Sequence, residues 1–220
     1  MKTLNQQLLN FGYTPNFKDE DYYVSKCNYY AFEIINSWPK WEKNFLNIYG
    51  EKNSGKTHLA SIFLKKSKSK RIDAYSFNNE SLNDIKIYEN VVLDNFDKNI
   101  NERLTYSLFN IIDQDNKYLI INSLEPINKI NFELEDLKSR ANNCLFAKIE
   151  KPDDELMFAL ILKNFSDRQI VIDKKLIDFI IKRIDRSYSK ISEFIYKIDE
   201  ISLKKKKPID LKTIKEVLKV

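Results

Sequence analysis

Residues 45–64 read FLNIYGEKNSGKTHLASIFL, and the eight residues from Gly50 to Thr57 satisfy the pattern GxxxxGK[ST] in full. The apolar and aromatic run Phe45–Tyr49 predicts a short buried strand before this loop, and the run His58–Leu64 predicts a helix after it. Between a strand and a helix, such a loop surrounds phosphates with backbone N–H groups at the positive end of the helix. The stretch therefore predicts a phosphate-binding loop within an α/β domain; a chance match in a surface loop is the alternative.

The residue types of this phosphate loop (residues 50–57) predict binding of ATP or ADP together with Mg²⁺. A side chain at Gly50 or Gly55 would obstruct the path of the phosphates, and glycine is scarce here, at 3 of 220 residues. Lys56 would neutralise β- and γ-phosphate charge, and the Thr57 hydroxyl would bind Mg²⁺. The nucleotide-binding residues predicted for this stretch are Gly50, Asn53, Ser54, Gly55, Lys56, Thr57 and His58.

A second motif for nucleotide binding follows at Val91–Asp94, where the apolar strand VVLD ends in a carboxylate. From the end of a neighbouring strand, Asp94 would reach the magnesium shell beside the phosphate loop; a turn after a strand is the alternative. Most hydrolysing proteins with such motifs have Asp or Glu at the next position to polarise the attacking water, whereas this chain has Asn95. Because an amide is unable to act as a base, the catalytic base position is impaired.

Strand and helix patterns alternate along the first 150 residues. A helical pattern spans Ile100–Asp115, with its apolar residues on one face. Short apolar runs typical of strands recur at residues 71–76, 91–93, 118–122 and 144–149. This alternation predicts an α/β fold, a P-loop base domain whose sheet is mainly parallel.

After Pro152 only helical patterns remain, and Asp153, Asp173 and Asp210 are placed to act as N-caps of three of the helices. Four helices of this kind predict a small helical lid domain. The expected organisation is a tail at residues 1–21, a nucleotide-binding base domain at 22–150 and an all-helical lid at 151–220.

The composition excludes several classes of protein. With 43% hydrophobic and 31% charged residues, the chain is expected to be globular rather than disordered. Its longest apolar run, Met157–Leu162, is far short of the roughly 20 residues of a membrane helix. The first fifteen residues lack a secretory signal. We therefore expect a cytoplasmic protein without a membrane partner.

Cysteine, histidine and net charge exclude other sites. Cys27, Cys144 and the single His58 are too few for a zinc site, and the cysteines are expected to be reduced core residues. A net charge of +5 is weak for a dedicated nucleic-acid binder. The run Lys204–Lys207 is expected to be a solvated helix end rather than a DNA-binding patch.

Several segments of the chain resemble the AAA+ ATPases of the DnaA clade, and most closely the short Hda-type proteins that inactivate the replication initiator. The segments that carry the resemblance are residues 50–60, 91–97, 121–123, 135–140, 38–41 and 167–169, together with Tyr23, Val24, Asn28 and Ala31. The resemblance covers nearly the whole chain and implies the AAA+ fold with a helical lid.

The resemblance also implies a role for Arg140, which follows the DLxSR pattern of this clade. In the family this arginine is a finger that meets the γ-phosphate bound to a neighbouring subunit; a surface ion pair with Glu135 or Asp136 is the alternative. Asn122 or Ser123, at the end of a strand, would sense the γ-phosphate, with a strand-end turn as the alternative.

Other positions are implied to contact the nucleotide or to have lost a contact. Val24 lies in the segment that closes over adenine in the clade. Ser192 stands where relatives present a lid arginine to the phosphates, and nearby Lys190 and Arg186 are imperfect substitutes. Together with Asn95, this departure predicts weak hydrolysis of the chain's own ATP.

Residues Gln7–Phe11 resemble the short peptide with which Hda-type proteins bind the DNA polymerase sliding clamp. Gln7, Leu8 and Phe11 would be its anchors, although Asn10 replaces an apolar residue of the pattern. A packed N-terminal strand or a frayed end is the alternative. This peptide would bring the chain to DNA only indirectly, through the clamp.

The resemblance implies a regulator rather than an initiator. The 33 positions from 58 to 90 are too few for the extra helical insertion that initiators use on single-stranded DNA, and no helix-turn-helix pattern follows the lid before Val220. The expected function is to stimulate hydrolysis of ATP bound to the initiator DnaA. The alternatives are a self-sufficient ATPase of helicase-loader or remodeller type, and a clamp- or membrane-tethered scaffold with structural nucleotide. The resident nucleotide, ATP or ADP, and a homodimeric state stay open.

Overall fold

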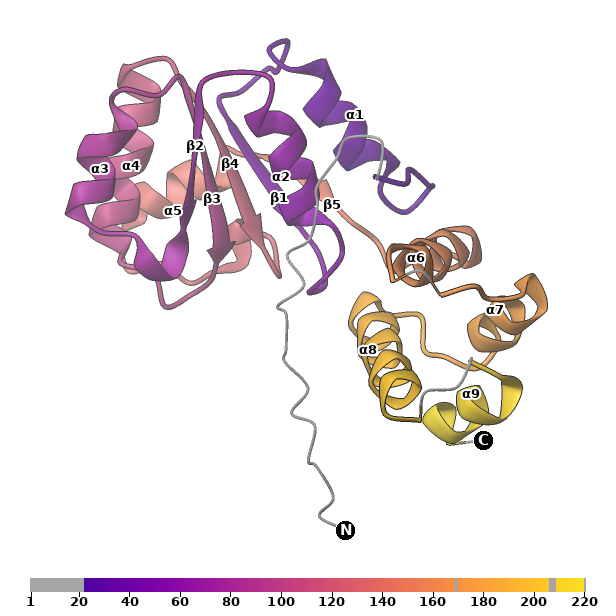
Figure 1. Cartoon of the computed structure of the whole chain (residues 1–220). Helices are drawn as coiled ribbons and strands as arrows, with labels where there is room; N and C mark the ends of the chain where they lie inside the picture. Colours follow the sequence, from indigo (N-terminus) through magenta and orange to yellow (C-terminus); the bar gives the residue numbers. More distant parts are fainter. Residues whose placement is uncertain (1–21, 169, 206–208, 220) are drawn as a thin grey trace.

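The computed structural model describes residues 22–168, 170–205 and 209–219 (Figure 1). Within them, five strands form one sheet in the order β2-β3-β4-β1-β5, and every neighbouring pair is parallel. The strands are β1 (Phe45–Tyr49), β2 (Ser69–Asp73), β3 (Asn90–Phe96), β4 (Tyr118–Ser123) and β5 (Leu145–Lys148). The prediction of an α/β fold with a mainly parallel sheet is confirmed.

One predicted strand is shorter than expected. The run at 71–76 is a strand only as far as Asp73, and the next three residues form the 3-10 turn η2 (Ala74–Ser76). The Asp73 side chain accepts a hydrogen bond from the backbone N–H of Tyr75 at 2.9 Å. This local cap ends the strand, because it turns the chain away from the neighbouring strand.

Helices cover both faces of the sheet (Figure 1). Alternate residues of each strand face opposite sides, so the two cores contain different residues of the same strands. Leu46, Ile48 and Val92 pack with the helices of one face, and Val91, Leu93 and Leu119 pack with those of the other. The first face carries α1 (Tyr29–Ser37) and α2 (Lys56–Leu64), and the second carries α3 (Asn79–Ile85), α4 (Glu102–Gln114), α5 (Glu135–Asn142) and the turn η3 (Ile127–Lys129).

The helices after the sheet have a core of their own. They are α6 (Asp154–Asp167), α7 (Lys174–Ile181), α8 (Tyr188–Lys205) and α9 (Leu211–Leu218), which we call the lid helices. The three predicted N-caps are confirmed, since the carboxylates of Asp153, Asp173 and Asp210 each accept a backbone N–H at 2.8 Å. The domain limits stay a prediction, and the predicted tail at 1–21 lies outside the described residues.

Both cysteines are free and buried, as predicted.

In the part of the chain that the structure describes, no helix combines the length and the apolar character needed to cross a membrane.

Asn47 is a fully buried polar residue in the middle of β1. Its amide nitrogen donates to the carbonyl of Ile121 at 2.9 Å and to the hydroxyl of Ser123 at 2.8 Å, and its amide oxygen accepts from the N–H of Ile127 at 3.0 Å. Asn47 therefore joins β1 to the carboxyl end of β4 and to η3. This contact fixes the edge of the sheet from which the phosphate loop begins.

Replacing Asn47 with alanine is expected to lower the free energy of unfolding by about 2–4 kcal/mol, because it leaves a cavity and an unpaired buried N–H at Ile127. Urea unfolding followed by circular dichroism measures the change. Asn128→Ala, an exposed position in η3, is the control and should change the free energy by less than about 0.5 kcal/mol. Equal changes for the two variants would contradict the structural role of Asn47.

Candidate nucleotide-binding site

The phosphate loop connects β1 to α2, as the sequence predicts. A Cβ atom at Gly50 would lie 2.7 Å from the carbonyl oxygen of Ile149, so no side chain fits there. Gly55 has a φ of 95°, in the left-handed region that favours glycine, and a Cβ there would lie 3.1 Å from the Tyr22 ring. The backbone therefore requires glycine at both positions. Asn53, with a φ of 66°, also adopts the left-handed conformation.

The amine of Lys56 is folded back onto the phosphate loop. It donates to the carbonyl oxygens of Gly50 and Glu51, both at 2.8 Å, and lies 3.4 Å from the Ser54 hydroxyl oxygen. Burial lowers the pKa of Lys56 to about 8, although the nearby charges of Asp94 and Glu51 oppose this shift. The amine is therefore only partly protonated just above neutral pH, and anionic phosphate would restore its charge.

Asp94 lies two residues before the end of β3 and is buried. Its carboxylate accepts hydrogen bonds from the side-chain amide of Asn122 at 3.2 Å and from the N–H of Asn95 at 3.1 Å. A pocket of about 420 Å³ opens beside it, lined by Thr57, Arg71, Asp73, Asp94 and Asn95. The structure thus brings together the predicted metal ligands Thr57 and Asp94, the base position Asn95 and the neighbouring Asn122.

These residues fit a magnesium-bound nucleotide. Hydroxyl and carboxylate oxygens suit Mg²⁺, which is commonly held by one or two protein oxygens together with phosphate oxygens. The buried amide oxygen of Asn122 has no hydrogen-bond partner among the described residues, so a ligand or water at this position would satisfy it. Thr57 and Asp94 would hold the metal, which would neutralise phosphate charge when bound.

The segment expected to close over adenine lies between the phosphate loop and α6. Tyr22 packs edge-on against His58, with ring centres 5.2 Å apart, and the Tyr23 hydroxyl donates to Glu155 of α6 at 2.7 Å. The side chain of Asn28 is buried and hydrogen-bonds to the backbone at Tyr23 and Ser25, which shapes the turn around Val24.

Glu51 of the phosphate loop binds the start of α8, a contact that sequence analysis missed. Its carboxylate accepts from the hydroxyl of Ser187 and from the N–H groups of Tyr188 and Ser189, the latter two at 3.2 Å. Burial raises the pKa of Glu51, but these hydrogen bonds outweigh burial and lower it overall. The loop carboxylate thus caps a helix 136 residues away in sequence, which ties the phosphate loop to the lid helices.

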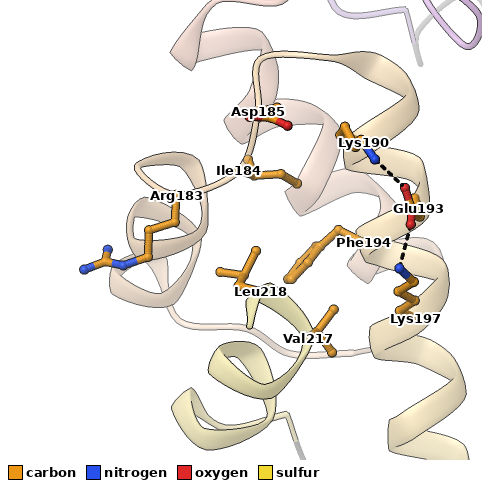
Figure 2. A pocket seen from close by; sticks show the side chains of 9 residues that line it. All are labelled: Arg183, Ile184, Asp185, Lys190, Glu193, Phe194, Lys197, Val217 and Leu218. Atoms are coloured by element: carbon orange, nitrogen blue, oxygen red, sulfur yellow. Dashed lines mark hydrogen bonds and ion pairs between the residues drawn. The ribbon is translucent and has the colours of Figure 1, made fainter. Parts of the chain in front are cut away.

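Neither basic residue near Ser192 is directed at the phosphate loop. Ser192 is exposed on α8. Lys190 is paired with Glu193 at 3.1 Å, beside a pocket of about 220 Å³ in the lid (Figure 2). Arg186 is paired with Asp154 at 2.8 Å. Both basic side chains are therefore paired with carboxylates of the lid helices.

Arg140 lies on α5, on the face of the sheet opposite the helix α2 that follows the phosphate loop. Its guanidinium pairs with Asp113 and donates to the side-chain oxygen of Asn110 at 2.7 Å, both on α4. It also lies 5.5 Å from the ring centre of Tyr106. The structure therefore keeps Arg140 away from the chain's own phosphate loop and pairs it with residues other than Glu135 and Asp136. Gln7, Leu8 and Phe11 lie outside the described residues.

Comparison with solved structures finds this architecture elsewhere. Domain III of the replication initiation protein DnaA from Thermotoga maritima matches with a TM-score of 0.78 and 21% identity, covering 94% of this chain and 97% of that one. The fold is that of a DnaA-like AAA+ domain. AMPPCP-bound DnaA from Aquifex aeolicus matches this chain with a TM-score of 0.68 and 22% identity, over 88% of this chain and 70% of that one. The Holliday junction branch migration motor RuvB of Thermotoga maritima has a TM-score of 0.61 and 14% identity, over 80% and 61%.

Sequence comparison agrees with the fold. The chromosomal replication initiator protein DnaA of Thermoanaerobacter sp. strain X514 is 28% identical over an alignment of 231 positions that covers 93% of this chain. The chain spans about half, 52%, of the length of that relative. No protein-family model matches the chain.

The lowered pKa of Lys56 predicts proton uptake on nucleotide binding. In the free chain the amine loses its proton as the pH rises through about 8, whereas bound phosphates would keep it charged. The affinity for Mg-ADP is therefore expected to fall as the pH rises from 8 to 9.5, by at most about tenfold per pH unit. Titration calorimetry in buffers of different ionisation enthalpy should show proton uptake in this range.

Lys52→Ala, an exposed residue of the same loop, is the matched control and should keep the pH dependence, whereas Lys56→Ala should abolish binding. An affinity that stays constant between pH 8 and 9.5 in the wild type would contradict the assignment of Lys56.

Proposed function

We propose that this DnaA-like domain is a nucleotide-binding regulator of replication initiation, of the Hda type. It binds ATP or ADP with Mg²⁺ in the phosphate-loop site, binds the sliding clamp loaded on DNA through Gln7, Leu8 and Phe11, and presents Arg140 to ATP bound to the initiator DnaA. The initiator then hydrolyses its ATP and becomes inactive.

The observation that carries this proposal is a binding site whose hydrolytic part is incomplete. The loop, Lys56, Thr57 and Asp94 are arranged to hold a nucleotide, but the residue after Asp94 is the neutral Asn95. Such a site suits a regulator that turns over its own nucleotide slowly rather than a motor that turns over rapidly. Positioned general bases contribute about 10² to 10⁴ in rate, so their loss predicts slow turnover.

The position of Arg140 supports action on a partner. Its side chain is 28% exposed and lies on α5, across the sheet from α2. The surrounding Asp113, Asn110 and Tyr106 hold the guanidinium at the surface of the chain. An arginine held at the surface in this way is available to a neighbouring subunit without a large rearrangement, and charge-stabilising arginines supplied in trans are worth about 10³ to 10⁵ in rate.

The names of the relatives support a second candidate. The matching curated proteins are initiators, and one matching structure is DnaA bound to AMPPCP and single-stranded DNA. The second candidate is therefore an initiator-like subunit that assembles on DNA. The short stretch of 33 positions between Thr57 and Val91 disfavours it, because the resemblance implies that initiators of the clade carry an extra helical insertion in this part of the chain.

Arg140→Ala is expected to reduce stimulation of the initiator's ATPase by at least about 100-fold, since the guanidinium would stabilise charge that develops in the transition state. The assay measures phosphate release from DnaA with clamp loaded on DNA. Arg140→Lys should rescue little, because lysine lacks the planar fork that donates to two phosphate oxygens.

Lys138→Ala, on the same helix, is the matched control and should stimulate normally. If Arg140 only forms a surface pair, its removal would cost less than about 1 kcal/mol of stability and leave stimulation intact. That result would exclude the finger.

Replacing Gln7, Leu8 and Phe11 together with alanine is expected to abolish clamp binding, because short-peptide recognition concentrates its energy in a few buried anchors. Interferometry with immobilised clamp measures the complex, and the nucleotide affinity of the same variant should be unchanged. Asn5→Ala, just before the peptide, is the control. Equal clamp affinity for the triple variant and the wild type would remove the tether from the proposal.

A further inference from the structure

Asn95 is in direct contact with a carboxylate from the neighbouring strand. Its side-chain nitrogen donates to Oδ2 of Asp73 at 2.6 Å. Asp73 is the last residue of β2 and lines the same pocket as Thr57 and Asp94. The neutral amide of Asn95 is therefore hydrogen-bonded to the carboxylate of Asp73.

Strand register places Asp73 on the phosphate-binding side of the sheet. Asp73 is the direct partner of Asp94 in the parallel pair of β2 and β3. Paired residues of neighbouring strands face the same side of a sheet, and Val92, two residues before Asp94, packs in the core beneath α2. Asp73 thus faces the side that carries the phosphate loop and Thr57.

The two oxygens of Asp73 have different tasks. Oδ1 accepts the N–H of Tyr75 and caps the turn η2, which fixes the side chain. Oδ2 accepts the hydrogen bond from Asn95, and a carboxylate oxygen can accept a further one. The side chain is exposed enough to meet water while the cap holds its orientation.

We propose that Asp73 is the catalytic base for a slow hydrolysis of the chain's own ATP, with Asn95 as the residue that positions it. The attacking water's oxygen forms a bond to the γ-phosphorus, and the bond from that phosphorus to the bridging oxygen breaks. The electron pair leaves with ADP, while the water's proton passes to the Asp73 carboxylate. The reaction converts the resident nucleotide to ADP without a partner.

This inference rests on the nucleotide binding in the proposed function, but it needs neither the initiator nor the clamp. A base presented from the adjacent strand, in place of one at position 95, explains why turnover would be slow rather than absent. As a general base, Asp73 would act on the attacking water and not on bound ADP. Loss of the Asp73 carboxylate should therefore weaken binding of a transition-state analogue and leave binding of ADP alone unchanged.

The test is Asp73→Asn, because asparagine keeps the oxygen that caps η2 and loses the base. Single-turnover hydrolysis of the variant's own ATP should fall by at least tenfold. Compared with the wild type, the variant should bind Mg-ADP with aluminium fluoride at least tenfold more weakly. Its affinity for Mg-ADP alone should be unchanged. Asp73→Ser, which also retains a capping oxygen, should behave in the same way.

Asp97→Asn is the matched control, since Asp97 contacts the same turn through Tyr75 but does not line the pocket, and it should leave both measurements unchanged. Urea unfolding of each variant checks that the fold is intact. Unchanged turnover and analogue affinity in Asp73→Asn, or a wild type that binds ATP and never hydrolyses it, would overturn the inference alone. A wild type that binds no nucleotide would overturn the proposed function as well.

Discussion

The parallel alignment of the strands is the constraint on which the whole candidate site depends. Because β1 to β4 all run in the same direction, their carboxyl ends meet at one edge of the sheet. That edge carries Asp73, Asp94 and Asn122, and it is also where the phosphate loop begins at Gly50. The buried Asn47 holds the edge together, since its hydrogen bonds join β1 to β4 across the point where the loop leaves the sheet.

The charged side chains of the phosphate loop, Lys56 and Glu51, are hydrogen-bonded to groups within the chain. The Lys56 amine donates to loop carbonyls, and the Glu51 carboxylate accepts from the start of α8. A bound phosphate would compete for the Lys56 amine, whereas the Glu51 contact joins the same loop to the lid helices. The phosphate loop and the start of α8 are therefore in direct contact, through a carboxylate whose pKa is lowered by its hydrogen bonds to that helix.

Much of the fold follows from local patterns, because apolar runs and capping carboxylates act over a few residues. The strand at Phe45–Tyr49 and the caps at Asp153, Asp173 and Asp210 are therefore predicted correctly.

Contacts between distant segments have no local pattern and could not be predicted. Glu51 reaches α8 from 136 residues away, and Asp73 meets Asn95 only because β2 pairs with β3. The pairing of Arg140 with α4, rather than with its neighbours on α5, likewise depends on tertiary packing.

The proposal that Arg140 acts on ATP bound to the initiator is tested most simply by an experiment that identifies whose ATP is hydrolysed. DnaA is loaded with ATP labelled at the γ-phosphate and mixed with this protein, itself loaded with unlabelled ADP, and with clamp on DNA. If Arg140 acts on ATP bound to the initiator, release of labelled phosphate from DnaA is accelerated. Release at the unstimulated rate would contradict this proposal.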